Sequence, residues 1–242
     1  MRGPRTYTLR RSPRARSVRL TLRPDGELVV TLPLRAPERL AHRLVDDRAA
    51  WIERHRARLA AGQACLAARP ALDRGRPLML SGVAHTILLV PADGRVRTRI
   101  HHVDAQDRQA PAAVKVLLAR GDERALAVVL ERWLRLQARA ALARRIAIRA
   151  RDLGVDPGPL TVRDQRSRWG SASRRGTLSF SWRLVLAPAA VLDYVVVHEL
   201  AHLRVFGHGP RFWALVRAHV PEADQHRRWL RAHDVDLRHA LD

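Results

Sequence analysis

The sequence has few of the residues that cross-link small secreted domains or anchor a chain in a membrane. Cys65 is the only cysteine among 242 residues, which excludes an intramolecular disulfide and a cysteine-based zinc knuckle. No run approaches the roughly 18 consecutive apolar residues of a membrane-spanning helix. Residues 1–5 also lack the apolar core of a signal peptide. We therefore expect a soluble, cytoplasmic protein that makes no membrane contact.

Acidic residues and lysine are also scarce. Lys115 is the only lysine, and 45 basic residues face 23 acidic ones, for a formal net charge of +22. The positive electrostatic field of such a chain attracts phosphates and acidic surfaces, so nonspecific binding of nucleic acid or another polyanion is one interpretation. A solvated basic surface without a dedicated partner explains the composition equally well.

Alternating hydrophobic segments predict strands in the first half of the chain. Segments at 7–10, 18–22 and 28–32 indicate a small N-terminal sheet, and a helix is expected from Pro37 to about Ala61. Further strands are expected at three segments: 87–90 and 96–100, joined as a hairpin around 92–94, and 114–117.

The second half is expected to be mainly helical. A helical hydrophobic period runs from about Asp122 to Leu153. The sequence therefore predicts an α+β fold, with a small β-sheet and helix at the N-terminus. We expect a β-rich region with one helix over 1–120, packed on a core over 121–242 in one compact unit.

The most informative stretch is His-Glu-Leu-Ala-His at 198–202. His198 and His202 stand four residues apart, so on a helix they project from one face and can share one Zn²⁺ ion. Glu199 can then hold and deprotonate a metal-bound water. Residues 191–197 are mostly apolar, which indicates a buried helix where polar side chains need a strong partner. One zinc ion per chain is favoured over histidines that only form hydrogen bonds in the core.

A catalytic zinc site needs a third protein ligand. His208 follows His202 after five residues, and Gly207 can adopt the left-handed conformation that ends a helix and returns His208 toward the metal. Glu222 is the alternative ligand, although its surroundings are typical of a helix N-terminus. The His208 spacing is that of metzincins, but Val205 stands where their pattern has glycine. No methionine follows the motif either, so the chain is not a metzincin.

The segment before this helix is expected to form a strand at 160–163 and a hairpin between 168–171 and 177–182. A free sheet edge can bind an extended peptide as an additional strand. The candidate substrate-binding residues there are Arg168, Trp169, Gly170 and Ser171. The alternative, which the sequence supports equally, is that Trp169 and Trp182 only pack over the helix that carries His198 and His202 and bind no substrate.

Tyr194 lies one helical turn before His198. It is a further candidate for substrate binding, as a donor to a developing oxyanion. A purely packed side chain is the alternative interpretation.

Several motifs together resemble the YgjP-like metallopeptidase family, which is related to the SprT-like proteases. They are Arg-x-Arg-Trp-Gly-Ser at 166–171, the segments 178–184 and 193–202, His208, and Phe212-Trp213. The resemblance is dense over about 155–230 and looser in the N-terminal strands. Ala172 departs from the family pattern, which usually has cysteine there, so any role of that thiol is absent.

The resemblance implies a zincin-like core, with the active-site helix packed under an antiparallel hairpin or sheet. It also implies zinc ligands at His198, His202 and His208, with Glu199 as the base.

Three functions fit these patterns. A zinc metallopeptidase would hydrolyse peptide bonds of a polypeptide substrate through zinc-bound water, with Glu199 as general base. A metal-dependent phosphohydrolase would apply the same chemistry to nucleotides, whose phosphates the arginines would attract. A basic nucleic-acid-binding protein with a non-catalytic zinc site is the third. Glu199 disfavours the third function, because a purely structural zinc site needs no base. We favour the metallopeptidase, and the phosphohydrolase is the alternative enzyme.

Overall fold

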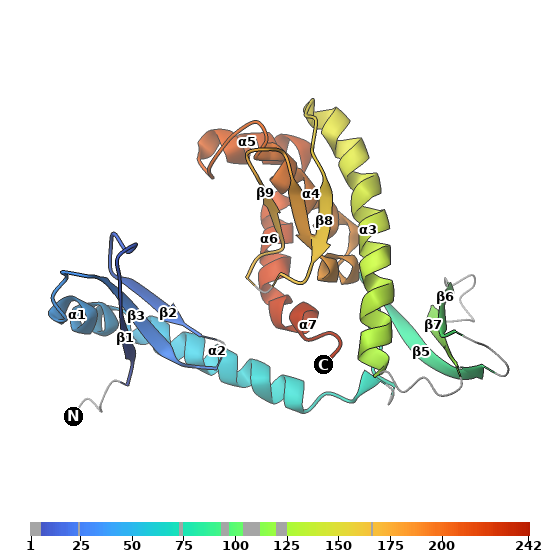
Figure 1. Cartoon of the computed structure of the whole chain (residues 1–242), viewed down its shortest axis with the longest axis horizontal. Coiled ribbons are helices and arrows are strands. Elements are labelled where there is room, and N and C mark those ends of the chain that lie inside the picture. Colours follow the sequence, from blue (N-terminus) through green and yellow to red (C-terminus); the bar gives the residue numbers. More distant parts are fainter. Residues whose placement is uncertain are drawn as a thin grey trace. The chain divides into compact units, whose positions relative to one another are not determined.

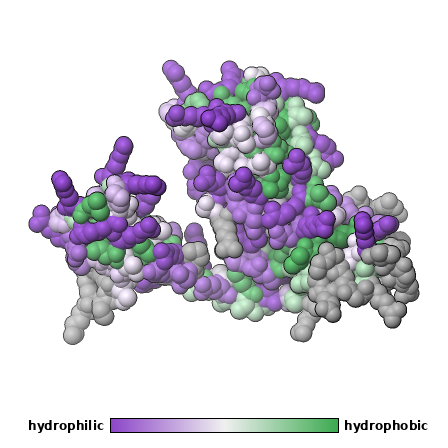
Figure 2. Space-filling view, viewed as in Figure 1, coloured by the Kyte–Doolittle hydropathy of each residue, from purple (hydrophilic) through white to green (hydrophobic). Residues whose placement is uncertain are grey.

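The computed structural model describes residues 6–23, 25–72, 75–92, 97–103, 112–119, 125–165 and 167–242. The contacts within the chain divide it into two units, Met1–Arg69 and Pro70–Asp242 (Figure 1). Each unit has its own cluster of buried hydrophobic residues. Hydrophilic side chains cover much of the surface seen in Figure 2.

The first unit contains a three-stranded sheet and two helices. The strands are β1 (Thr8–Ser12), β2 (Arg19–Leu22) and β3 (Leu28–Pro33), in the order β1-β3-β2. The predicted single helix is instead two, α1 (Arg39–Asp47) and α2 (Ala49–Ala67), because Arg48 has non-helical backbone angles. The buried faces of β3, α1 and α2 form the core of this unit, from Leu28, Val30, Leu32, Ala41, Val45 and Ile52.

A four-stranded sheet begins the second unit. Its strands are β4 (Leu78–Leu80), β5 (Val83–Ala92), β6 (Arg99–Val103) and β7 (Ala113–Ala119), in the order β4-β5-β7-β6. The predicted hairpin between 87–90 and 96–100 is wrong, since β5 and β6 each pair with β7 rather than with one another. Asp93 and Gly94 of its predicted turn lie outside the described residues.

This sheet belongs with the C-terminal half of the chain. The backbone N–H of Ser81 donates to the carbonyl of Val185 at 2.7 Å, and that of Gly82 to Leu186 at 3.2 Å. Val114 and Val116 of β7 are fully buried in the same core as the C-terminal helices. The division between units therefore lies at residues 69–70 and not near the expected position 120.

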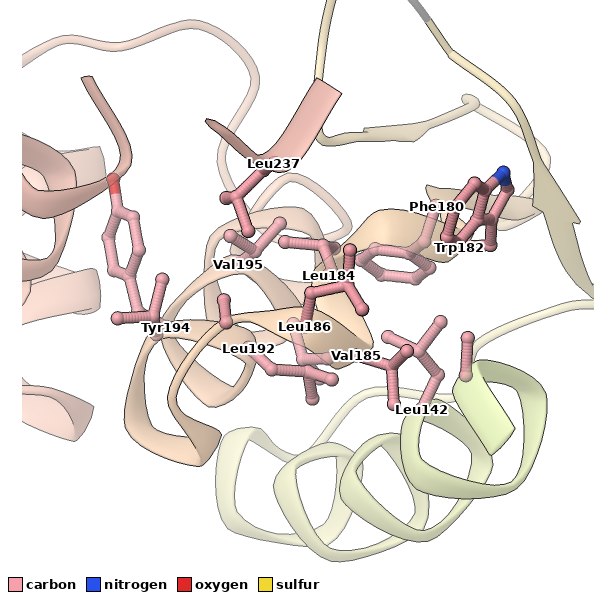
Figure 3. Packing of buried hydrophobic residues seen from close by; sticks show 14 of the residues in the cluster. Leu142, Phe180, Trp182, Leu184, Val185, Leu186, Leu192, Tyr194, Val195 and Leu237 are labelled. Carbon is pink, nitrogen blue, oxygen red and sulfur yellow. The ribbon is translucent and has the colours of Figure 1, made fainter. Parts of the chain in front are cut away.

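The core of the second unit forms around α3 (Leu126–Leu153) and α4 (Ala189–Ala201). The helix predicted from the hydrophobic period is present as α3. It is capped at its C-terminal end by Gly154, whose φ of 62° is left-handed. The 3-10 helix η2 (Trp182–Leu186) packs on α3 and α4. Figure 3 shows Leu184 and Leu186 of η2 between Leu142 of α3 and the buried face of α4.

The second unit contains another sheet, of three strands, which lies against α4 (Figure 1). It consists of β8 (Leu160–Arg163), β9 (Gly170–Ala172) and β10 (Leu178–Ser181), in the order β8-β10-β9. The predicted hairpin between β9 and β10 is confirmed, but β8 runs parallel to β10, so the sheet is mixed. The chain ends in α5 (Pro210–His219), α6 (Ala223–Ala232) and α7 (Asp234–Arg238).

The predicted α+β class is confirmed by these sheets and helices. Among the described residues, no helix combines the length and the apolar character needed to cross a bilayer.

Candidate metal and catalytic site

Helix α4 presents the first two histidines. His198 lies in its last turn, and His202 directly follows the helix at its C-cap. The helix ends at Ala201, so the predicted helix stop at Gly207 is wrong. Gly207 does have a left-handed φ of 84°, but within the loop that precedes α5. That turn brings His208 back over the end of α4.

The three histidines converge on one point. One ring nitrogen from each of His198, His202 and His208 lies within 4.8 Å of the other two. The Nε2 atoms of His198 and His208 are 3.1 Å apart. Phe212 and Trp213 of α5 surround them: the Phe212 ring stacks on His202 at 4.5 Å, and the Trp213 ring lies 5.8 Å from His198.

These donors fit a zinc ion. In a tetrahedral site with zinc–nitrogen bonds of about 2.0–2.1 Å, two ligand nitrogens lie about 3.3–3.4 Å apart, close to the spacing of His198 and His208. The Nδ1 atom of His202 faces the carbonyl of Val205 at 3.4 Å, which leaves its Nε2 atom for a metal. Nδ1 of His198 is buried without a partner among the described residues, so the ring depends on its other nitrogen for a polar interaction.

The electrostatics also favour metal binding. Burial, with the neighbouring His202 and His208 rings, lowers the pKa of His198 to about 3. Burial and His208 likewise lower the pKa of His202. Both rings are therefore neutral at physiological pH, which is the form that ligates a metal.

Glu199 is buried between α4 and the edge strand β9. Glu199 is 6% exposed. A Cβ atom placed on Gly170 would lie 2.8 Å from both Cγ and Oε1 of Glu199, so only glycine leaves room for this carboxyl group. Gly170, a candidate substrate-binding residue in the sequence, thus leaves room for the side chain of Glu199.

The environment of Glu199 changes its proton affinity. Burial raises its pKa from 4.5 to about 7, while a backbone hydrogen bond with Ala172 and the positive charge of Arg168 oppose that rise. A carboxyl group with a pKa near neutrality is suited to accept and return a proton at pH 7.

The competing third ligand lies elsewhere. Glu222 is the N-cap of α6 and is exposed. It is absent from the group of described residues that can hold a metal, which contains only the three histidines. The structure thus brings His208, and not Glu222, to the other two.

The predicted substrate-binding residues fall at different places. Gly170 contacts Glu199, and Arg168 acts on it through its charge. The carbonyl of Trp169 accepts a hydrogen bond from Ser181 at 2.9 Å, and its ring lies under the guanidinium of Arg238 at 4.6 Å. Trp169 therefore contacts β10 through its backbone and α7 through its ring.

The other two candidates are Ser171 of β9 and Tyr194 of α4. Ser171 pairs with Ser179 across the sheet. Tyr194 is 5% exposed and its ring lies 6.0 Å from that of His198. Its pKa is raised, chiefly by burial.

One positioning contact was missed by sequence reasoning. Arg149 of α3 donates from Nε to Asp193 Oδ1 at 3.0 Å and from Nη2 to Oδ2 at 2.5 Å. Asp193 is 7% exposed and lies in α4, five residues before His198. An acidic residue inside an otherwise apolar helical run was the available signal, because a buried carboxylate requires a partner.

Three converging imidazoles beside a buried carboxyl group are the features of a metal-dependent hydrolase. A family model described as the YgjP-like metallopeptidase domain matches residues 16–233. The chain therefore belongs to the YgjP-like metallopeptidase family, as its motifs predicted, and this family implies a bound metal ion, typically zinc.

A solved structure with similarity to the chain is that of the metallopeptidase zymogen of Pyrococcus abyssi abylysin. The two are 22% identical, and the match covers 38% of this chain and 93% of that chain with a TM-score of 0.32. No curated protein matches the chain.

Proposed function

We propose that the protein is a zinc-dependent peptidase that hydrolyses peptide bonds of a polypeptide, with Glu199 as the general base. The observation that carries this proposal is the placement of the Glu199 carboxyl group. It is buried, lies on α4 beside the first of three converging histidines, and is held against β9 by Gly170 and Ala172. A purely structural zinc site would not need an acid with a raised pKa.

The neutral imidazoles of His198, His202 and His208 would hold the zinc ion. Bound there, zinc would polarise a carbonyl oxygen and lower the pKa of a water molecule to about 7. Glu199 would take the proton from the attacking water and return it to the departing amine. Its pKa of about 7 allows both transfers near neutral pH.

The edge strand β9 offers a place for the substrate. It pairs with β10 on one side, and no described strand pairs with its other side. An extended polypeptide can add to such an edge by backbone hydrogen bonds, which recognise any sequence. Because Gly170 contacts Glu199, a peptide at this edge would lie next to the proposed base.

The test compares the wild-type chain with Glu199→Gln and His198→Ala. Purified wild type should contain about one zinc ion by elemental analysis and release new amino termini from an unfolded protein substrate such as casein. Glu199→Gln should keep its zinc and lose at least about 100-fold in turnover, within the range for a general base. His198→Ala should lose the metal.

Glu222→Gln is the matched control, because it makes the same chemical change at an exposed residue outside the histidine group. It should keep both zinc and turnover. Equal activity of Glu199→Gln and wild type would reject Glu199 as base. Phosphate release from a nucleoside triphosphate, without new amino termini from protein, would favour a phosphohydrolase instead.

A further inference from the structure

The outer face of the β8-β10-β9 sheet carries a polar hollow of about 600 Å³. Leu178 and Phe180 of β10 are fully buried on the inner face, so Ser179 between them points to the outer face. Ser179 pairs with Thr161 of β8 and Ser171 of β9. Cross-strand partners share a face of the sheet, so the three hydroxyl groups form a row across it.

The hollow excludes the three histidines but borders the surroundings of Glu199, because Arg168 and Ala172 line it and also act on that carboxyl group. Gly170 of β9 faces Glu199, and the next residue, Ser171, lines the hollow on the other face. None of the three histidines lines it.

The lining has the chemistry of an anion site. Six of the lining residues are serine or threonine, two are the arginines Arg163 and Arg168, and no acidic side chain is among them. Ser179 Oγ accepts a hydrogen bond from Gln165 Nε2 at 2.9 Å, which leaves its own hydrogen free to donate. Arg163 is exposed and forms no ion pair with any residue that the structure describes.

The size and surroundings of the hollow indicate a chain-like ligand. The volume of about 600 Å³ far exceeds that of one phosphate group. Arg174 and Arg175 are exposed in the turn that follows the lining residue Ser173, so positive charge continues past the end of the hollow. No aromatic side chain lines it, and stacking on bases, which single-strand binding proteins use, is therefore not available.

We propose that this hollow binds a run of phosphate groups in a chain polyanion, without reading any base sequence. Arginine, serine, threonine and glutamine are the side chains that proteins use on phosphate oxygens. The phosphodiester backbone of single-stranded nucleic acid and inorganic polyphosphate share this chemistry. The proposal does not rest on the proposed peptidase activity, because neither Glu199 nor any of the three histidines lines the hollow.

The experiment measures binding of a fluorescein-labelled 20-nucleotide oligothymidine to the full chain by anisotropy, over a series of salt concentrations. Arg163→Glu should weaken binding about tenfold at low salt and lower the slope of log K against log salt by about 1. Ser179→Ala should weaken it about threefold without any change in net charge, on the scale of one lost hydrogen bond.

Arg144→Glu is the matched control, since it changes the net charge equally at an exposed arginine of α3 outside the hollow. Much weaker binding by Arg163→Glu than by Arg144→Glu supports the proposal. Equal effects would overturn it, because the +22 charge would then act diffusely. Absence of any binding at a low salt concentration of about 50 mM would overturn it as well.

Unlabelled competitors then identify the source of the phosphates. Oligoadenylate of equal length should compete as well as oligothymidine, and stronger competition by inorganic polyphosphate would assign the hollow to that polymer. Poly-L-glutamate of equal charge should compete poorly. If it competes as well as the phosphate polymers, the hollow has no preference for phosphate and the proposal fails.

Discussion

At the scale of single residues, the contact between Gly170 and Glu199 is the most restrictive feature of the site. A methyl group at residue 170 would lie 2.8 Å from the Glu199 carboxyl oxygen Oε1, a distance that forces one of them to move. Because α4 is buried on nearly all sides, the side chain of Glu199 is the part that can yield. Glu199 can hold this position only because residue 170 of strand β9 has no Cβ atom.

We expect Gly170→Ala to lose most peptidase activity while it retains zinc, because the methyl group displaces the base and not the histidines. Overpacking of this kind costs about 1–3 kcal/mol of stability. Gly209→Ala is the control, since a Cβ there meets no atom within 4 Å and its φ of −75° suits any residue. Zinc content and turnover of both variants are the measurements, and full activity in Gly170→Ala would contradict the placement of Glu199.

Glu199 should also make the stability of the metal-free protein depend on pH. Its pKa rises from 4.5 to about 7 in the folded state, so the folded chain holds a proton that the unfolded chain releases between these values. The resulting stabilisation is fully present below pH 4.5 and is lost as the pH rises through 7. The shift corresponds to about 3 kcal/mol.

Urea unfolding of the metal-free wild type and Glu199→Gln at about pH 4.5 and pH 8 measures this contribution. The glutamine side chain of the variant stays neutral, so the variant should gain up to about 3 kcal/mol relative to wild type between these pH values. The lowered pKa of His198 acts in the opposite direction, but it is common to both proteins and cancels in the comparison. A difference that is independent of pH would show that the Glu199 pKa is not raised.

At the scale of elements, the ion pair of Arg149 with Asp193 joins α3 to α4 and so positions the helix that carries the histidines. The side chain of Asp193 is 10% exposed, and its loss would leave Arg149 without its closest partner. We expect Asp193→Ala to lower the free energy of unfolding by on the order of 3 kcal/mol.

Asp152→Ala is the comparison, because Asp152 contacts the same Arg149 from an exposed position. It should cost about 0–1 kcal/mol. Chemical denaturation of both variants tests the difference, and similar losses would show that Asp193 does not contribute through its burial.

Elements with a local pattern could be predicted from the sequence, and elements with nonlocal partners could not. Helix α3 and the β9–β10 hairpin followed from periodicity and a short turn, both of which act between near neighbours. The pairing of β5 and β6 with β7 did not, since the same alternation permits several strand orders. The break at Arg48 had no glycine or proline to mark it.

At the scale of the whole molecule, the two units have separate buried cores, and all three histidines lie in the second unit. We therefore expect a chain of residues 70–242 to fold alone and bind about one zinc ion. Circular dichroism and elemental analysis of this fragment are the tests. An unfolded or metal-free fragment would show that residues 1–69 are required for the core.

The sequence alone predicted the first two metal-ligand candidates, His198 and His202, because residues four apart project from the same face of any helix. It also predicted the base, because Glu199 is next to His198 in the motif. It also determined the YgjP-like family and the basic character. The tertiary structure decided that His208 rather than Glu222 joins them, and that Gly170 accommodates the base. Both depend on how distant segments pack around α4, and packing is set by the whole core rather than by neighbours along the chain.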